Sequence, residues 1–147
     1  MTPIQYLKQY RYATLERLSL LRRREELRAK YAYPRAIQYT DMPKAHNNTG
    51  DLSDYAAKLM ELERILDDKV VECITLETEI LCRIDLIKSY EEREVLRLRY
   101  IDLDPRTHRW RSFQWISWHL HYSQAQTFRL HRLALKHFPM PNNDESK

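Results

Sequence analysis

The chain has 147 residues, 43% of them hydrophobic, and a formal net charge of +4, which fits one ordinary domain or two small ones. Its single glycine argues against a sheet-rich protein with many tight turns, and against a glycine-rich loop that cradles a nucleotide phosphate. The composition therefore predicts an almost entirely helical protein.

Residues 3–31 form the first predicted helix. Pro3 suits a first helical turn, and four apolar residues lie close to one stripe: Ile4, Leu7, Leu18 and Leu21. The run Arg22–Arg24 occupies the outer face, which we interpret as a solvated surface, with direct contact to phosphate as the alternative. From residue 32 to residue 50 the periodicity stops and prolines, asparagines and the glycine gather, so we expect a loop there.

Residues 51–90 hold the longest periodic run, with apolar residues at spacings of three, four or seven: Leu52, Tyr55, Leu59, Leu62, Leu66, Cys73, Leu76, Ile80 and Ile87. Lys69 and Arg83 stand at positions where this periodic pattern would otherwise have apolar residues. Residues 1–31 carry eight Lys/Arg and three Glu, whereas residues 51–90 carry five Lys/Arg and ten acids. Opposite charges predict that the two helices pair as a long antiparallel, coiled-coil-like hairpin.

Such a long helix cannot bury its stripe alone, so we expect either a homodimer in a four-helix arrangement or a monomeric hairpin. Residues 1–90 would then form a helical hairpin and oligomerisation region. Residues 91–138 would form a second domain, which opens with a helix that ends before Pro105 because the residue ahead of a proline is pushed out of the helical region. Residues 139–147 are predicted to be a flexible tail.

Cys73 and Cys82 lie nine residues apart within the helical pattern, on roughly opposite faces. They are expected to be free thiols in a reducing compartment. No apolar run approaches the roughly 20 residues that span a bilayer, and no leader is visible. We therefore expect a cytoplasmic protein without a membrane partner.

The segment from Pro105 to Asn143 contains six Lys/Arg, five histidines and no acidic residue. Two short helices can be drawn between Ser112 and Phe138, each with a serine N-cap, Ser112 and Ser123, and with a break at residues 121–123. In the second helix Thr127, Leu130 and Ala134 fall on one side, which predicts that they are buried. This spacing is typical of a helix-turn-helix.

The opposite side of that second helix presents Ala125, Arg129, Arg132 and Lys136, with Phe128 beside them and Gln124 and Gln126 in the first turn. This is the layout of a recognition helix in a double-stranded DNA-binding protein. Arg129 is the candidate for a bidentate contact to guanine, and either glutamine could read adenine. Arg132, Lys136 and some of Arg106, Arg109 and Arg111 would hold phosphates. Phe128 could contact a thymine methyl or pack against Trp118. The candidate DNA-binding residues are therefore Ser123, Gln124, Ala125, Gln126, Phe128, Arg129, Arg132, Lys136, Arg109 and Arg111.

The segments EEREVLRLRYI, SFQWISWHLHYS and FRLHRLALKHF resemble the sigma-70 region 4-like helix-turn-helix of phage late-transcription regulators, the ArpU/RinA-like group. The stretch YTDMPKAHNNTGDLSDY is also similar to that group. The resemblance implies a phage or prophage protein in a bacterial cytoplasm that binds specific DNA near promoters and recruits host RNA polymerase. It implies no catalysis.

Enzyme and metal functions find little support in the sequence. His119 and His121, or His131 and His137, are spaced so that they do not share a helix face, and their segment holds no acid or cysteine to complete a metal site. We expect no cofactor. The alternative function is a small phage protein that inhibits a host machine, such as a nucleic-acid-guided defence nuclease or the polymerase.

Overall fold

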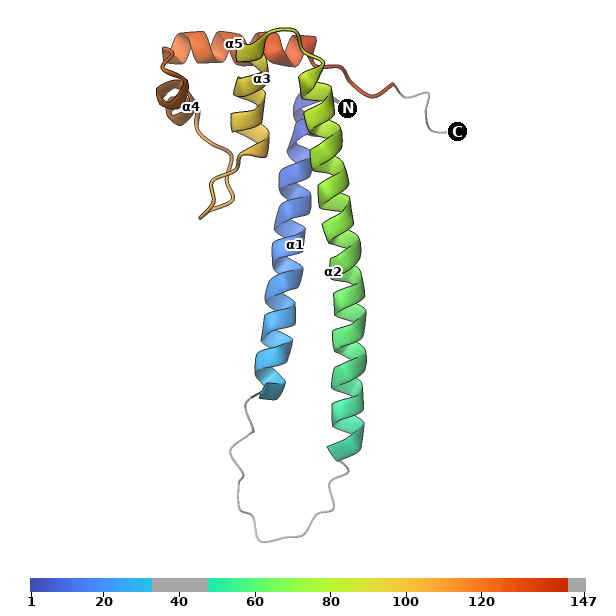
Figure 1. Ribbon diagram of the computed structural model, residues 1–147. Helices are drawn as coiled ribbons and strands as arrows, with labels where there is room; N and C mark the ends of the chain where they lie inside the picture. Colours follow the sequence, from blue (N-terminus) through green and yellow to red (C-terminus); the bar gives the residue numbers. More distant parts are fainter. Residues whose placement is uncertain (33–47, 143–147) are drawn as a thin grey trace. The chain divides into compact units, whose positions relative to one another are not determined.

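The computed structural model describes residues 1–32 and 48–142, and all its regular structure there is helical. The elements are α1 (Pro3–Ala32), α2 (Asn48–Asp85), α3 (Tyr90–Leu96), the π-helical turn η1 (Arg97–Ile101), α4 (Phe113–Leu120) and α5 (Gln124–His137) (Figure 1). The predicted all-α class is confirmed for these residues. Of the predicted loop 32–50, residues 33–47 lie outside the described residues, and residues 48–50 already belong to α2.

α2 ends at Asp85, before the predicted end near Tyr90. Ser89 adopts an extended backbone and its hydroxyl accepts the Glu92 N–H, so it caps α3 instead of continuing α2. Arg93 stabilises the break by donating to the Ile87 carbonyl at 2.6 Å. The predicted third helix is divided into α3 and η1 and ends before Pro105, as expected.

The chain divides into two compact units, residues 1–15 with 72–147 and residues 16–71. We call them the terminal unit and the helix-pair unit. This division differs from the predicted boundary at residue 90, because the first turns of α1 and the last turns of α2 share a core with α3, η1 and α5. That core contains Tyr6, Leu7, Ile80, Ile84, Ile87, Leu96, Tyr100, Ile101, Ala134 and Phe138.

The first residues after α5 pack against the terminal unit. Phe138 is buried, Met140 packs against the core, and Arg83 donates to the Pro139 carbonyl at 3.2 Å. The guanidinium of Arg83 also lies over the Tyr6 ring, 5.7 Å from its centroid. Residues 139–142 of the predicted tail are thus described, whereas residues 143–147 lie outside the described residues.

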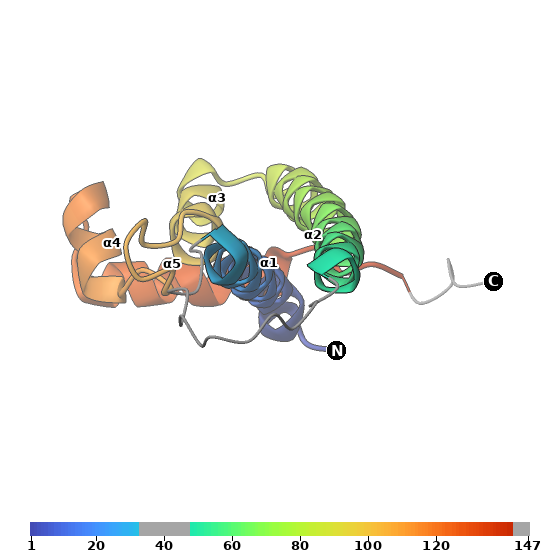
Figure 2. The ribbon, with the colours of Figure 1, turned by 90° about the horizontal axis from the view of Figure 1, so that it is seen from below.

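In the helix-pair unit the stretches of α1 and α2 run antiparallel, since Glu16 pairs with Lys69 at 2.6 Å and the Tyr31 ring stacks on Tyr55 at 4.2 Å. Figures 1 and 2 both show these stretches side by side. Arg28 of α1 also pairs with Glu63 of α2 at 2.9 Å. The pair Arg28–Glu63 is of the predicted kind, with the basic group on α1 and the acid on α2, whereas in Glu16–Lys69 the charges are reversed.

The two cysteines lie on different sides of α2, as their spacing predicts: Cys73 is buried and Cys82 is exposed, and both are free thiols. Within residues 1–32 and 48–142, no helix is both long enough and apolar enough to cross a bilayer.

Candidate nucleic-acid interface

Helices α4 and α5 begin at the two predicted serine caps. The Ser112 hydroxyl accepts the Trp115 N–H and the Ser123 hydroxyl accepts the Gln126 N–H, each at 3.1 Å. Between the helices, His121 takes a left-handed conformation with φ 60°, which histidine tolerates better than most residues. The Tyr122 N–H then donates to the Ser117 carbonyl at 3.0 Å, closing the turn. The break predicted at residues 121–123 is confirmed.

A buried polar contact holds α4 against α5. The Ser117 and Thr127 hydroxyls lie 2.9 Å apart, and Thr127 also donates to the Ser123 carbonyl at 3.0 Å. Ile116 of α4 and Ala134 of α5 have no exposed surface, and neither does Thr127. The predicted buried side of α5 is confirmed for Thr127 and Ala134, while Leu130 is half-buried. This side fixes which face of α5 points outward.

The outward face of α5 is exposed along its length. We define the α5 outer face as Gln124, Ala125, Gln126, Arg129, Arg132 and Lys136, all of which are exposed. Across residues 1–32 and 48–142, no ion pair engages the three cations of this face. Their charges are therefore available to an anionic partner, and the Ser123 hydroxyl, occupied as a cap, is less available than predicted.

Of the two alternatives predicted for Phe128, the packing against Trp118 is not found. The Phe128 ring lies 4.6 Å from the ring of Phe113, not against Trp118, and Phe128 stays 47% exposed. Trp118 is 73% exposed. Trp118 is not among the site residues predicted from the sequence. In the sequence, the apolar residues Phe113, Ile116 and Leu120 repeat at spacings of three and four, and Trp118 lies beside this stripe, which was the one signal that it faces water.

Arg109 and Arg111 lie in the connection between η1 and α4, which Figure 1 shows looping out from η1 and returning to α4 within the terminal unit. Arg111 donates to the Asp102 carbonyl, pairs with Asp104 at 3.4 Å and covers the Trp115 ring at 4.2 Å. Arg109 is exposed. Arg111 is thus engaged in this connection and on α4, whereas the cations of the α5 outer face form no ion pair with the described residues.

Asp104 organises that connection. Its carboxylate accepts the backbone N–H groups of Arg106 and Thr107, and these hydrogen bonds, with Arg111 nearby, hold the pKa of Asp104 below its usual range. Trp110, in the same connection, packs against α1, where the cationic groups of Arg11 and Lys8 lie 4.4 and 5.0 Å from the centroid of its ring. The basic connection is a folded element of the terminal unit.

Two histidines of α5 hold it against the preceding helical segment. Nε2 of His131 lies 3.0 Å from the Tyr100 hydroxyl, and burial together with the charge of Arg99 lowers the pKa of His131 to about 4. His131 is therefore neutral near pH 7, and its Nε2 shares a hydrogen bond with the Tyr100 hydroxyl. Nδ1 of His137 lies 2.8 Å from the carboxylate of buried Glu92. Neither histidine belongs to the exposed basic face.

Within the described parts of the chain, no three His, Cys, Asp or Glu residues are grouped so that they could hold a metal ion. Comparison with protein-family models, with curated proteins and with solved structures finds no match to this chain.

Proposed function

We propose that the chain is a sequence-specific double-stranded DNA-binding regulator of transcription, with α4 and α5 as its helix-turn-helix and α5 as the recognition helix. The observation that carries the proposal is the α5 outer face, where Arg129, Arg132 and Lys136 are exposed and pair with no acid of the described residues. Unpaired cations on one helix face can neutralise phosphates, and this neutralisation supplies most of the non-specific affinity for DNA.

The order of residue types along α5 supports base reading at its first turns. In a recognition helix the N-terminal residues contact base edges in the major groove, while later cations hold the backbone. Gln124 and Gln126 are in the first turn, Arg129 follows, and Arg132 and Lys136 come later. We assign adenine reading to the glutamines, guanine reading to Arg129 and phosphate contacts to Arg132 and Lys136.

Two neighbouring aromatic residues can extend this interface. Phe128 keeps 47% of its surface exposed, which leaves a ring edge for a thymine methyl. The exposed indole of Trp118, on the helix that precedes the turn, adds apolar surface next to the DNA backbone. Arg109 and Arg111 are given no base or phosphate contact in this arrangement, because they lie in the connection before α4, where Arg111 pairs with Asp104 and covers Trp115.

The resemblance to ArpU/RinA-like phage regulators supports the further proposal that the chain acts near promoters together with host RNA polymerase. In this proposal α1 and α2 form the antiparallel hairpin that carries the DNA-binding region, and the protein works in the cytoplasm of a bacterial host. No catalytic step is assigned.

Selection from random duplexes, followed by mobility shifts at physiological salt, tests the proposal. The full chain is expected to enrich one motif and to bind it more tightly than scrambled duplexes of the same length. Equal affinity for all duplexes, or none for any, would contradict it. An absence of binding would instead favour an inhibitor that acts on a host protein.

A further inference from the structure

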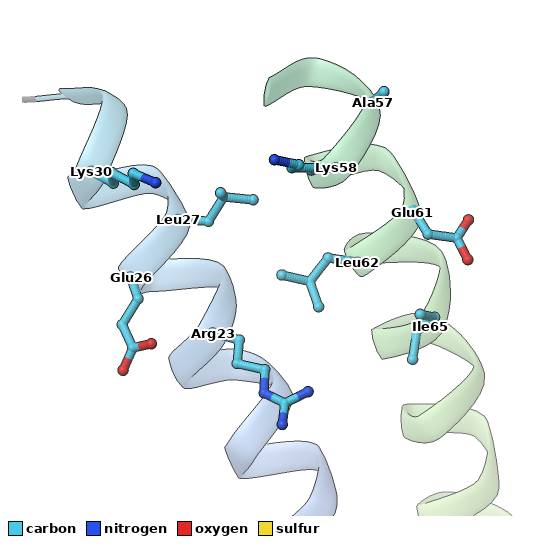
Figure 3. A pocket seen from close by; sticks show the side chains of 9 residues that line it. All are labelled: Arg23, Glu26, Leu27, Lys30, Ala57, Lys58, Glu61, Leu62 and Ile65. Carbon is cyan, nitrogen blue, oxygen red and sulfur yellow. The ribbon is translucent and has the colours of Figure 1, made fainter. Parts of the chain in front are cut away.

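The helix-pair unit has an open apolar groove of about 690 Å³ between α1 and α2. Figure 3 shows its side chains, with Leu27 of α1 and Leu62 of α2 directed toward each other across it. Ala57 and Ile65 extend the apolar lining along α2, and Arg23 and Glu61 lie at its edges. The groove lies entirely within residues 16–71.

This unit buries very little by itself. Among its described residues Leu66 is the only hydrophobic one in the buried class, Leu27 and Leu62 are half-buried, and Leu52, Met60, Ile65 and Val71 are 66%, 73%, 37% and 63% exposed. Helices gain most of their stability in proteins by packing an apolar face. Two helices that leave most of their apolar side chains half-buried or exposed gain only part of that stabilisation, so the groove is expected to be covered by other helices.

The charge distribution indicates which helices cover it. From residue 16 to 32, α1 carries six Lys/Arg and three Glu, and from residue 48 to 71, α2 carries three Lys/Arg and six Asp/Glu. A net charge of +3 on one helix thus matches −3 on the other. If the two-fold axis runs parallel to the helices, α1 of each copy packs on α2 of the other, and both of these helix–helix contacts are attractive. If the axis is perpendicular to the helices, α1 packs on α1 and α2 on α2, and both contacts are repulsive.

We infer that this groove is the homodimerisation surface of the chain, closed by the same groove of a second copy with α1 packed on the partner's α2. The inference goes beyond the proposed DNA binding and does not depend on it. The pairs Glu16–Lys69 and Tyr31–Tyr55 fix the register within one chain. By that register Arg23 lies level with Leu62, next to Glu61, which pairs with Arg64 of its own helix at 2.6 Å. Arg23 of one copy is therefore expected to meet the partner's Glu61 beside Arg64, twice per dimer.

The molar mass of the full chain by sedimentation equilibrium tests the surface. The wild-type protein is expected to be a dimer, and Ile65→Asp is expected to be monomeric, because the new carboxylate would be buried in the apolar groove. Met60→Asp is the matched control, since it puts the same residue on the outer side of α2 and should remain dimeric. Circular dichroism shows whether both variants keep their helix content.

A charge exchange tests the partner's orientation. Arg23→Glu and Glu61→Arg are each expected to weaken self-association by about tenfold, since each creates two like-charge contacts per dimer. An equimolar mixture of the two variants should regain wild-type association, because both contacts in the mixed dimer are again attractive. A contact within one chain cannot be restored by mixing.

Three results would overturn the inference: a wild-type chain that stays monomeric at all concentrations, a Met60→Asp variant that dissociates while Ile65→Asp does not, or a mixture no stronger than its components. A monomeric wild type would leave the groove to a different protein. These measurements contain no DNA, so their failure is distinct from a failure of the mobility shifts.

Discussion

Arg129 and Lys136 share the exposed face of α5, but their chemistry differs. The guanidinium of Arg129 can donate two parallel hydrogen bonds to the edge of a guanine, whereas the ammonium of Lys136 acts as a point charge suited to phosphate. Their order along α5, early for Arg129 and late for Lys136, matches these two roles.

Arg129→Ala is therefore expected to remove about 1–3 kcal/mol of discrimination between the selected duplex and its single-base variants. Lys136→Ala is expected to weaken binding to all duplexes alike and to lower the salt dependence by about one phosphate contact. Competition titrations over a salt series measure both quantities. An equal loss on every duplex for both variants would contradict the assignment.

His131 makes stability depend on pH. Its pKa is about 4 in the folded chain against the ordinary 6.5. Below pH 6.5 the unfolded chain therefore binds a proton that the folded chain does not, and the free energy of unfolding decreases as the pH falls toward 4. Allowing for the solvent-exposed part of the ring, the loss is about 2 kcal/mol. Above pH 6.5 this contribution is constant.

Urea unfolding of His131→Gln between pH 7 and 4 checks this expectation, since the variant should lose that part of the pH dependence. His119→Gln is the control, because His119 is exposed on α4 and its replacement should leave the wild-type profile. If His131→Gln kept the full wild-type slope, another group would be responsible.

At the scale of elements, the position of α5 depends on its attachment to α4. The turn at His121 leaves little freedom, and the buried hydroxyls of Ser117 and Thr127 meet between the helices. Each hydroxyl also has a nearby backbone carbonyl to which it can donate: that of Phe113 for Ser117 and that of Ser123 for Thr127. The contact between the helices can therefore be removed from either side without leaving a buried donor unpaired.

A double-mutant cycle with Ser117→Ala and Thr127→Val measures this contact. We expect each variant to lose about 1 kcal/mol of unfolding free energy, with a coupling between them of about 0.5–1 kcal/mol. Losses that add without coupling would mean that the hydroxyl contact does not stabilise the pair of helices. Neither substitution changes a residue of the α5 outer face. A change in DNA affinity would therefore indicate that α5 has moved relative to α4.

At the scale of the whole molecule, the location of charge matters more than its total. The formal net charge of +4 is the sum of basic and acidic stretches, and some of these charges pair with each other, as Arg28 of α1 does with Glu63 of α2. Only cations without such partners can bind phosphate without first breaking an ion pair.

Arg132→Gln and Arg28→Gln test this view, since each lowers the formal net charge from +4 to +3 by removing one exposed arginine, but Arg28 pairs with Glu63 whereas Arg132 pairs with no acid of the described residues. Arg132→Gln is expected to weaken binding to any duplex and to reduce its salt dependence by about one contact. Arg28→Gln should change neither. If both variants weakened binding equally, total charge, or a phosphate contact on α1, would explain the affinity.

The sequence by itself determined the features that depend on neighbours along the chain. The serine caps, the break at residues 121–123 and the buried side of α5 could be predicted because backbone capping and helical periodicity act over three or four residues. The exposure of Arg129, Arg132 and Lys136 followed from the same periodicity.

Only the tertiary structure decided which of the predicted site residues lie together. Asp104 holds Arg111 in the connection, and Glu92 and Tyr100 bind two histidines of a stretch that has no acid of its own. The core likewise joins the ends of α1 and α2 to the last helices, so the observed division of the chain, in place of the predicted boundary at residue 90, could not be predicted. These contacts join residues far apart in the sequence, and no local pattern specifies which distant side chains will meet.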